Sequence, residues 1–565
     1  MTNKELLAAE SGTIRKEWTG KTRIALAYPN HYHVGMSNLG FHAIYRLLND
    51  YEDVVCERAF LPEDNGATHG GIRSMESQRP LVDFDIIAFS ISFENDYPNL
   101  LTLLEEAGIP LWSSERETPH PLVIAGGVTG FLNPEPISPF VDCFLIGEAE
   151  PILDAFLDVY RKHSDKEELL KAIAVGVPGA YVPGLYDTAY NPDGTIAEFR
   201  PKSGIPAKVR RVVVEDLSPW DTCSIILTPH TTFRDTYLVE AGRGCPHGCR
   251  FCAAGFVYRP PRFRPKDALQ NSLEKGALRS KRIGLMAAAV SDVPHIEELC
   301  RKALDNGVQL SFSSLRADRL TPEFLDILRR GNFKTVTIAP DAGSERMRRV
   351  INKGITDQDV LRAADLVVSA GILNLKLYFM IGLPTETMSD VEAIVALCKQ
   401  VKHRFLKASR KKKRIGRIIV SLNSFIPKPF TPFQWVPLED VKILKAKIKQ
   451  VKEGLKGVAN IRVHADVPRW AYIQALLSRG DRRTAQLLAA AHENNGNWAK
   501  TLKASIINPD FYTYRERPLD EIFPWDFIDH GINKAFLVEE YHKALREETS
   551  PPCDVGRCKA CGVCK

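Results

Sequence analysis

Two long stretches of the chain alternate strand-length apolar runs with segments of helical periodicity. In the first stretch the apolar runs begin at Ile24, Ile86, Pro121 and Phe140. Nearly continuous apolar runs are typical of parallel strands that are buried on both faces. Helical patterns at 40–49 and 98–107 lie between them. We therefore expect an α/β, doubly wound, Rossmann-like domain over residues 1–160.

A second alternation covers residues 234–440. Its six strand-length runs begin at Val239, Ile283, Val308, Thr335, Leu373 and Arg417. Six strands that alternate with helical segments predict a partial (β/α)6 TIM-type barrel. Because chemistry in such barrels sits at the carboxyl ends of the strands, the residues that follow each run are the candidates for function.

The remaining segments have other patterns. Residues 161–233 carry Pro and Gly clusters and a predicted hairpin with its turn at 191–194, so we expect a linker that packs on both neighbours. Residues 441–548 are predicted to be mostly helical, over 441–458, 468–493 and 519–547. The chain closes in a cysteine-rich segment, 549–565. A length of 565 residues agrees with several domains.

Composition bears on the cellular compartment of the protein and on the chemistry of its cysteines. The net charge of +6 is mild and identifies no partner. The first twenty residues lack a signal-peptide core, and no stretch approaches the roughly 18 uninterrupted apolar residues of a membrane span, so a cytoplasmic protein with no membrane is expected. Seven of the twelve cysteines fall into two short clusters, which suggests metal rather than disulfides. The other five are expected to be buried structural residues: Cys56, Cys143, Cys223, Cys300 and Cys398.

The first cysteine cluster lies directly after the first run of the predicted barrel. The segment GRGCPHGCRFCAAGF places Cys245, Cys249 and Cys252 with C-x3-C-x2-C spacing. Three thiolates on one loop can ligate three corners of a [4Fe-4S] cubane. The open fourth iron can then be chelated by S-adenosylmethionine (SAM). Zinc is the alternative, but it usually takes paired cysteine or Cys/His sets, and no downstream pair in this region completes one.

This loop, with Phe251 just before its last cysteine, resembles the signature of the radical SAM superfamily, over about residues 237–437. The resemblance implies reductive cleavage of SAM to a 5'-deoxyadenosyl radical, with flavodoxin or ferredoxin as the reductant. The family's second strand ends in a Gly-Gly-Glu-like turn, whereas here Ala287, Ala288 and Ala289 follow, so a backbone contact to SAM near Ala288 is implied. Further SAM contacts are implied at Ser313, Arg316, Asp341, Ser344, Ile381 and Gly382.

The domain order resembles the radical SAM subgroup that carries an N-terminal cobalamin-binding domain. Gly126 and Gly127 follow one apolar run and fit the turns of that subgroup. Its cobalt-ligand motif, Asp-x-His-x-x-Gly, corresponds here to residues 30–35, with Tyr32 at the ligand position and Gly35 at its end. The resemblance implies cobalamin without a lower histidine, and hence cobalamin-dependent methylation as the leading reaction. A domain that binds nothing, or that serves as a substrate platform, is the alternative.

The second cysteine cluster lies in the C-terminal segment. Cys553, Cys558, Cys561 and Cys564 have C-x4-C-x2-C-x2-C spacing. Four thiolates are a complete ligand set for a second [4Fe-4S] cluster or for tetrahedral zinc. An auxiliary cluster and a structural knuckle both remain open.

Two basic segments bear on the substrate, which the sequence leaves unknown. The segments at 407–417 and 259–266 carry dense Lys and Arg, and RNA is a possible partner for such surfaces, although charge runs are also ordinary solvated loops. A methylthio- or sulfur-transferring RNA or protein modification enzyme without cobalamin is therefore the second hypothesis. The third is a non-catalytic iron-sulfur scaffold, for which the altered turn at Ala287–Ala289 is the only support.

Overall fold

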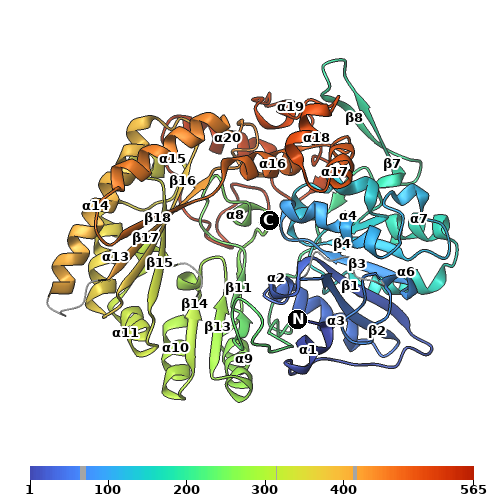
Figure 1. Ribbon diagram of the computed structural model, residues 1–565, viewed down its shortest axis with the longest axis horizontal. Coiled ribbons are helices and arrows are strands. Elements are labelled where there is room, and N and C mark those ends of the chain that lie inside the picture. The colour runs from blue at the N-terminus through green and yellow to red at the C-terminus, as the bar shows by residue number, and fades with distance from the viewer. Residues whose placement is uncertain (64–70, 313–314, 411–415, 565) are drawn as a thin grey trace.

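The structure of the protein is a computed structural model that describes residues 1–63, 71–312, 315–410 and 416–564. Two α/β units lie beside each other, and C-terminal helices lie across the top of both (Figure 1). None of the helices in the described residues is both long and apolar enough to cross a bilayer. The α/β class predicted from the apolar runs is confirmed. The predicted domain boundaries stay predictions.

The first unit is a six-stranded sheet in the order β2-β1-β3-β4-β5-β6. Strands β1 to β5 are parallel and β6 is antiparallel to β5. The strands are β1 (Thr22–His31), β2 (Val54–Leu61), β3 (Ile86–Ser90), β4 (Leu122–Gly126), β5 (Cys143–Leu145) and β6 (Ala180–Tyr181). The chain order reverses between β1 and β3, and such a switch point, at the carboxyl ends of the strands, is where doubly wound sheets bind ligands.

Strand β2 is absent from the predicted elements because charged residues interrupt its apolar run. Arg58 lies fully buried in the middle of this strand. Its guanidinium pairs with Glu10 at 2.7 Å and with Glu76 at 2.6 Å. Because both carboxylates pair with the guanidinium, the strand tolerates a buried arginine that sequence patterns assign to the surface.

Helices connect the strands of this unit and cover its sheet. They are α1 (Asn3–Ala8), α2 (Tyr32–Gly35), α3 (Leu39–Asp50), α4 (Tyr97–Glu106), α5 (Val128–Leu132), α6 (Leu153–Lys162) and α7 (Lys166–Gly176). Asn38 caps α3 by accepting a hydrogen bond from the amide of Phe41. This cap fixes the start of α3 at the carboxyl edge of the sheet.

A hairpin follows the first unit. It joins β7 (Tyr186–Tyr190) and β8 (Ile196–Pro201), and Gly194 donates to the carbonyl of Asn191 in the turn at 2.9 Å. Beyond the hairpin, β9 (Val209–Arg210) pairs in parallel with β19 (Ile528–Asp529) near the C-terminus. The segment between the two units is therefore tied to the end of the chain.

The second unit is a partial barrel built from two parallel sheets. They have the orders β10-β13-β14 and β15-β16-β17-β18, and a parallel bridge between Leu315 and Ile338 links them. The strands are β10 (Tyr237–Glu240), β13 (Arg282–Met286), β14 (Gln309–Phe312), β15 (Thr335–Asp341), β16 (Asn374–Ile381), β17 (Arg417–Ser424) and β18 (Ile461–Ala465). The first six of these confirm the predicted strands.

The helices of the barrel follow its strands. They are α8 (Ala254–Val257), α9 (Lys266–Arg279), α10 (Ile296–Asp305), α11 (Pro322–Arg330), α12 (Glu345–Val350), α13 (Asp357–Ser369), α14 (Met388–Arg410) and α15 (Val441–Leu455).

The predicted helical region contains three departures. Strand β18 adds a seventh parallel strand to the barrel, and its polar residues Arg462 and His464 obscure it in the sequence. The segment 468–493 forms two helices that separate near Gly480, and within 519–547 only 534–545 is α-helical. The C-terminal helices are α16 (Pro468–Arg479), α17 (Thr484–Glu493), α18 (Trp498–Ala504), α19 (Asp510–Thr513) and α20 (Lys534–Leu545).

In addition to the apolar cores of the two α/β units, a third apolar core lies beneath the C-terminal helices. It packs Phe256 of α8 against Trp435, Trp525 and Tyr541. Because α8 directly follows the three-cysteine loop, this core anchors the loop to the C-terminal region.

Candidate active site at the cysteine loop

The three-cysteine loop is closed at its base by two short antiparallel strands, β11 (Gly242–Arg243) and β12 (Arg262–Phe263). Gly244 starts the loop with a φ of +77°, and a Cβ atom there would lie 2.5 Å from the carbonyl oxygen of Tyr258. Only glycine adopts this conformation at such a close approach without strain. The local sequence therefore turns the loop back over its own base, at the carboxyl end of β10.

The three loop thiols lie in a common, largely buried environment. Burial raises the pKa of Cys245 to about 12 and that of Cys249 to about 11, and it also raises the pKa of Cys252. The charges of Cys249 and Cys252 raise the pKa of Cys245 further, and the charge of Cys252 raises the pKa of Cys249, as expected for thiols that lie near one another. Binding of iron would displace the thiol protons.

The fit of a cluster rests on this shared environment. Among the residues that the structure describes, no three His, Cys, Asp or Glu side chains gather as the ligands of a single metal ion. A cubane differs from a single ion because it takes one thiolate at each of several corners. Three neighbouring thiols on one loop can therefore occupy three of those corners.

Two of the predicted SAM-contacting residues lie at this loop. The charges of both Arg316 and Asp341 act on the pKa of Cys249. Asp341 pairs with Lys353 at 2.5 Å, and Arg316 donates to the carbonyl of Lys353 at 3.1 Å. Asp341 also has a φ of +64°, and strained residues of this kind cluster at functional sites. Lys353, which the sequence reasoning missed, therefore connects both predicted residues to the cysteines.

Other predicted residues have varied positions. Ser344 caps α12 by accepting from the amide of Met347, and its hydroxyl donates to Asp390 at 2.6 Å. Phe251 is half-buried against the third core. Ser313 lies outside the described residues, as do positions 411–415 of the basic run.

Ile381 ends β16, and a buried charge network holds Gly382, the residue after it. The amide of Gly382 donates to Glu386 at 2.7 Å, and Lys447 pairs with Glu386 at 2.8 Å and with Glu439 at 2.6 Å. Burial raises the pKa of Glu386 to about 7. Sequence reasoning missed this network. The available signal was a glutamate four residues after Gly382, directly beyond an apolar strand.

Further residues that the sequence reasoning missed brace the cysteine loop from its neighbours. His247 contacts Asp292 through a hydrogen bond of 2.8 Å. The side-chain amide of Asn352 donates to the carbonyl of Gly248 at 3.1 Å, and the amide of Arg250 donates to Ile351 at 3.0 Å. The loop is therefore held from the β13 and β15 sides of the barrel as well as from its own base.

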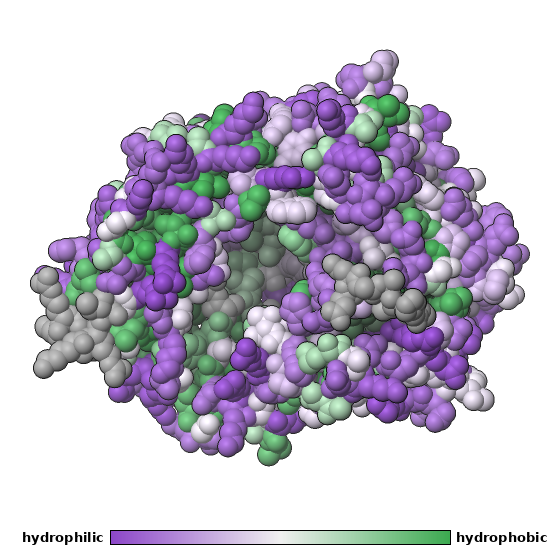
Figure 2. Space-filling view, viewed as in Figure 1, coloured by the Kyte–Doolittle hydropathy of each residue, from purple (hydrophilic) through white to green (hydrophobic). Residues whose placement is uncertain are grey.

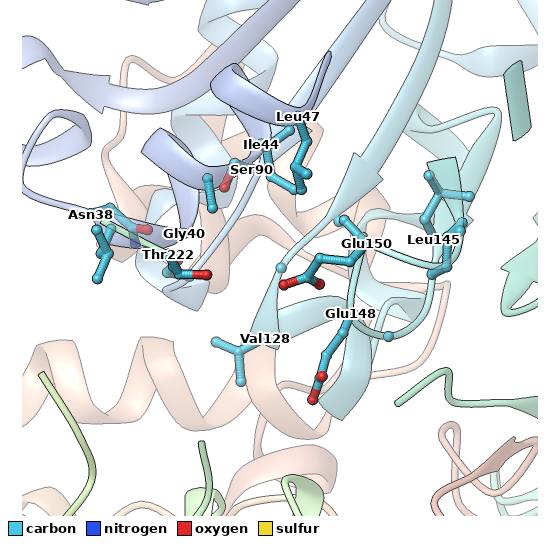
Figure 3. A pocket seen from close by; sticks show the side chains of 18 of the residues that line it. Asn38, Gly40, Ile44, Leu47, Ser90, Val128, Leu145, Glu148, Glu150 and Thr222 are labelled. Atoms are coloured by element: carbon cyan, nitrogen blue, oxygen red, sulfur yellow. Dashed lines mark hydrogen bonds between the residues drawn. The ribbon is translucent and has the colours of Figure 1, made fainter. Parts of the chain in front are cut away.

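A cavity of about 500 Å³ separates the cysteine loop from the first unit. Its lining includes the predicted residues Gly126, Gly127 and Ala288, together with Gly244 of the loop. Figure 3 shows Ile44 and Leu47 of α3 at one end of the cavity and Glu148 at the other. Figure 2 shows a deep hollow near the centre of one face, between the two α/β units. The cavity thus lies at the switch point of the first sheet and reaches the base of the cysteine loop.

The structure does not bring Tyr32 and Gly35 to this cavity. The Tyr32 hydroxyl donates to Glu10 at 2.5 Å, and its ring packs edge-on against Phe60. A Cβ atom at Gly35 would lie 2.4 Å from the Phe60 ring. Both residues therefore belong to the buried core around Arg58.

The second predicted cysteine cluster lies against the first. The amide of Cys553 donates to the carbonyl of Pro246, the neighbour of Cys245, at 2.7 Å. All four tail cysteines, Cys553, Cys558, Cys561 and Cys564, are free thiols.

Comparisons with known proteins agree with this arrangement. Residues 40–183 match the family described as "Radical SAM proteins, N-terminal", and residues 239–398 match "Radical SAM superfamily". The chain is 32% identical over 468 residues to "Uncharacterized protein MJ0966" of Methanocaldococcus jannaschii, covering 82% of this chain and 90% of that one. The chain therefore belongs to the radical SAM superfamily, as its cysteine loop predicts.

Two further relatives are more distant. The chain is 22% identical over 272 residues to "Uncharacterized methyltransferase PH0819" of Pyrococcus horikoshii, covering 46% of this chain and 54% of that one. Its fold resembles the radical SAM methyltransferase TsrM from Kitasatospora setae, a structure with cobalamin and a [4Fe-4S] cluster bound. That likeness has a TM-score of 0.50 at 13% identity and covers 86% of this chain and all of the other. It concerns the fold alone.

Proposed function

We propose that the protein is a radical SAM enzyme that uses cobalamin to methylate its substrate. The observation that carries this proposal is the cavity between the switch point of the first sheet and the cysteine loop. Ligands of doubly wound sheets bind at such a point. A cofactor placed there would lie beside Gly244, the residue before Cys245.

The mostly apolar lining of the cavity supports a ligand with an extended apolar face, such as that of a corrin ring. Apolar side chains of α3 form one end, and Gly126 borders open space, because the nearest atom to a Cβ there is the Leu145 carbonyl oxygen at 3.8 Å. Tyr32 is engaged with Glu10, which supports a corrinoid without a lower ligand from residues 30–35. The name of the Pyrococcus relative and the ligand of TsrM also support methyl transfer with cobalamin.

Each part of the site has a role in this proposal. Cys245, Cys249 and Cys252 hold the cluster, while Lys353 and Arg316 place positive charge beside Cys249. When bound, the cluster with SAM supplies a carbon-centred radical and the corrinoid supplies a methyl group. The chain would orient these groups, because the cavity lies between the first sheet and the base of the cysteine loop.

Radical formation is tested under anaerobic conditions. Protein loaded with iron and sulfide, then given dithionite and SAM, should release 5'-deoxyadenosine. The Cys249→Ala variant should release none, whereas the matched variant Cys300→Ala, which removes a buried thiol far from the loop in sequence, should match the wild type. Failure of the fully loaded wild type would favour a non-catalytic scaffold.

The cobalamin part is tested separately. Protein incubated with hydroxocobalamin and freed of excess ligand should retain about one cobalt per chain, the stoichiometry of a single cavity. Release of 5'-deoxyadenosine with only traces of cobalt would overturn the cobalamin part of the proposal. That result would still support SAM cleavage and would favour a methylthio-transferring enzyme without cobalamin.

A further inference from the structure

The last residues of the chain form a strap along the cysteine loop. The amide of Ser550 donates to the side chain of Asn352 at 2.9 Å, and the same side chain donates to Gly248. Arg250, between two loop cysteines and fully buried, donates to the carbonyl of Glu548 at 2.8 Å. With the bond from Cys553 to Pro246, these contacts hold the tail beside the loop.

Beyond the strap, the tail buries its cysteines and exposes almost everything else. From 551 to 564 only the four cysteines and Val563 are shielded from solvent, and Cys561 is 2% exposed. The carbonyl of Cys561 accepts from the amide of Asn533, which fixes this turn to the start of α20. Gly562 follows with a φ of +85°.

A segment with this burial pattern has almost no apolar core of its own. Short segments without a core are usually stabilised by a metal or by cross-links. Here the shielded face consists almost entirely of thiols, because Cys553, Cys558, Cys561 and Cys564 point away from solvent while their neighbours are exposed. Four thiols within twelve residues of one segment are enough to ligate a single cluster.

We propose that Cys553, Cys558, Cys561 and Cys564 bind a second [4Fe-4S] cluster and that this cluster is the entry point for electrons. Four thiolates complete the ligation of a cubane and leave no open iron for substrate. That ligation favours electron transfer over substrate chemistry. Three cysteines spaced by two residues each are typical of iron-sulfur proteins.

The position of the tail supports the relay. Pro246, the residue after Cys245, accepts a hydrogen bond from the amide of Cys553, so only one residue and one hydrogen bond separate the two cysteines. The opposite side of the tail faces solvent. Arg557 and Lys559 are exposed there, and they suit an acidic one-electron carrier of the flavodoxin or ferredoxin class. One electron from the reduced carrier would take the tail cluster from the 2+ to the 1+ state. Its passage to the loop cluster would return the tail cluster to 2+. The relay rests on the proposed SAM cleavage, whereas the second cluster does not.

Metal content decides whether the second cluster exists. Anaerobically reconstituted wild type should hold about eight irons and eight sulfides per chain, four of each for every cubane, with negligible zinc. The double variant Cys558→Ser, Cys561→Ser should hold about four irons, and its reduced signal in electron paramagnetic resonance should still change on addition of SAM. A wild type with about four irons and one zinc would overturn the proposal.

Matched variants separate this result from general damage. The double variant Cys300→Ala, Cys398→Ala removes two buried thiols outside both clusters and should keep the full iron content. Cys249→Ala should lose only the loop cluster. If the tail variant fails to fold, Mössbauer spectra of the wild type still count the two clusters.

The relay has its own readout. The rate of 5'-deoxyadenosine release is measured with reduced flavodoxin and with dithionite. The flavodoxin rate is divided by the dithionite rate, and this ratio is compared between the wild type and the tail double variant. This ratio should fall in the tail double variant, because a small reductant reaches the loop cluster directly. An unchanged ratio would overturn the relay and leave the second cluster as a structural element.

Discussion

Arg243 and Glu148 form an ion pair of 2.9 Å across the boundary between the two α/β units. Arg243 stands two residues before Cys245, and it also pairs with Glu150 at 2.5 Å and with Glu240 at 2.9 Å. Although burial alone would raise it, the hydrogen bonds from Arg262 and the charge of Arg243 hold the pKa of Glu148 below its usual value. The wall of the cavity and the base of the cysteine loop are therefore one connected frame.

We expect Arg243→Ala to destabilise the protein strongly. The change leaves Glu150 and Glu240 without their cation, while Glu148 keeps Arg262. Breaking buried pairs in this way typically costs about 3–5 kcal/mol of unfolding free energy. Urea unfolding measures the loss. The matched control is Arg404→Ala, because Arg404 is about half exposed and pairs with Asp365 at 3.4 Å, so its loss should cost less than about 1 kcal/mol. Equal losses in the two variants would contradict the role of Arg243.

Substitutions at the neighbouring cavity glycines Gly126 and Gly127 should affect different properties, cobalt retention in one case and stability in the other. Gly126→Leu points a side chain toward open space, so it should lower the cobalt retained per chain and leave the melting temperature nearly unchanged. At Gly127 the φ is +104° and a Cβ atom would lie 2.3 Å from the Ile91 carbonyl oxygen. Gly127→Ala should therefore lower the melting temperature whether or not cobalamin is present. Full cobalt retention by Gly126→Leu would place the corrinoid elsewhere.

The sequence predicted those parts of the molecule that are encoded locally. The cysteine loop and six barrel strands follow from short patterns, because each strand carries its own apolar run. Strand β2 escaped prediction because Arg58 needs partners at Glu10 and Glu76, which are distant in sequence. The contact between Cys553 and Pro246 joins residues about 300 positions apart, and no local pattern contains it. Tyr32 was expected at a cofactor by resemblance, but packing against Phe60 places it in the core.

The lysine beneath the end of β16 offers a test within a single helix. Lys447 in α15 is only 4% exposed at its side chain and pairs with Glu386 and Glu439. Lys447→Met should cost about 3–5 kcal/mol, because both carboxylates lose their buried cation. Lys449→Met, two residues on, removes a side chain that is 74% exposed and lies 3.8 Å from Glu453, so its cost should be below about 1 kcal/mol. Thermal unfolding of the two variants compares them directly, and similar melting temperatures would argue against the network.

His530 should make the fold sensitive to acid. Its ring is buried and donates to the carbonyl of Phe131 at 2.8 Å, and burial, aided by the nearby charge of Arg211, lowers the pKa of His530 to about 3. Below pH 6.5 the unfolded chain takes up a proton here that the folded chain does not. The unfolding free energy should therefore fall as the pH decreases from about 6.5 toward 3, by at most about 1.4 kcal/mol per pH unit from this group.

The variant His530→Gln isolates that contribution. Glutamine keeps a donor for Phe131 but takes up no proton, so its unfolding free energy should decline less steeply with acid than that of the wild type. His403→Gln, at an exposed position of α14, should follow the wild-type curve. Urea unfolding at a series of pH values gives the three slopes. A wild-type slope equal to that of His530→Gln would mean that His530 titrates alike in both states, against the burial that the structure assigns to it.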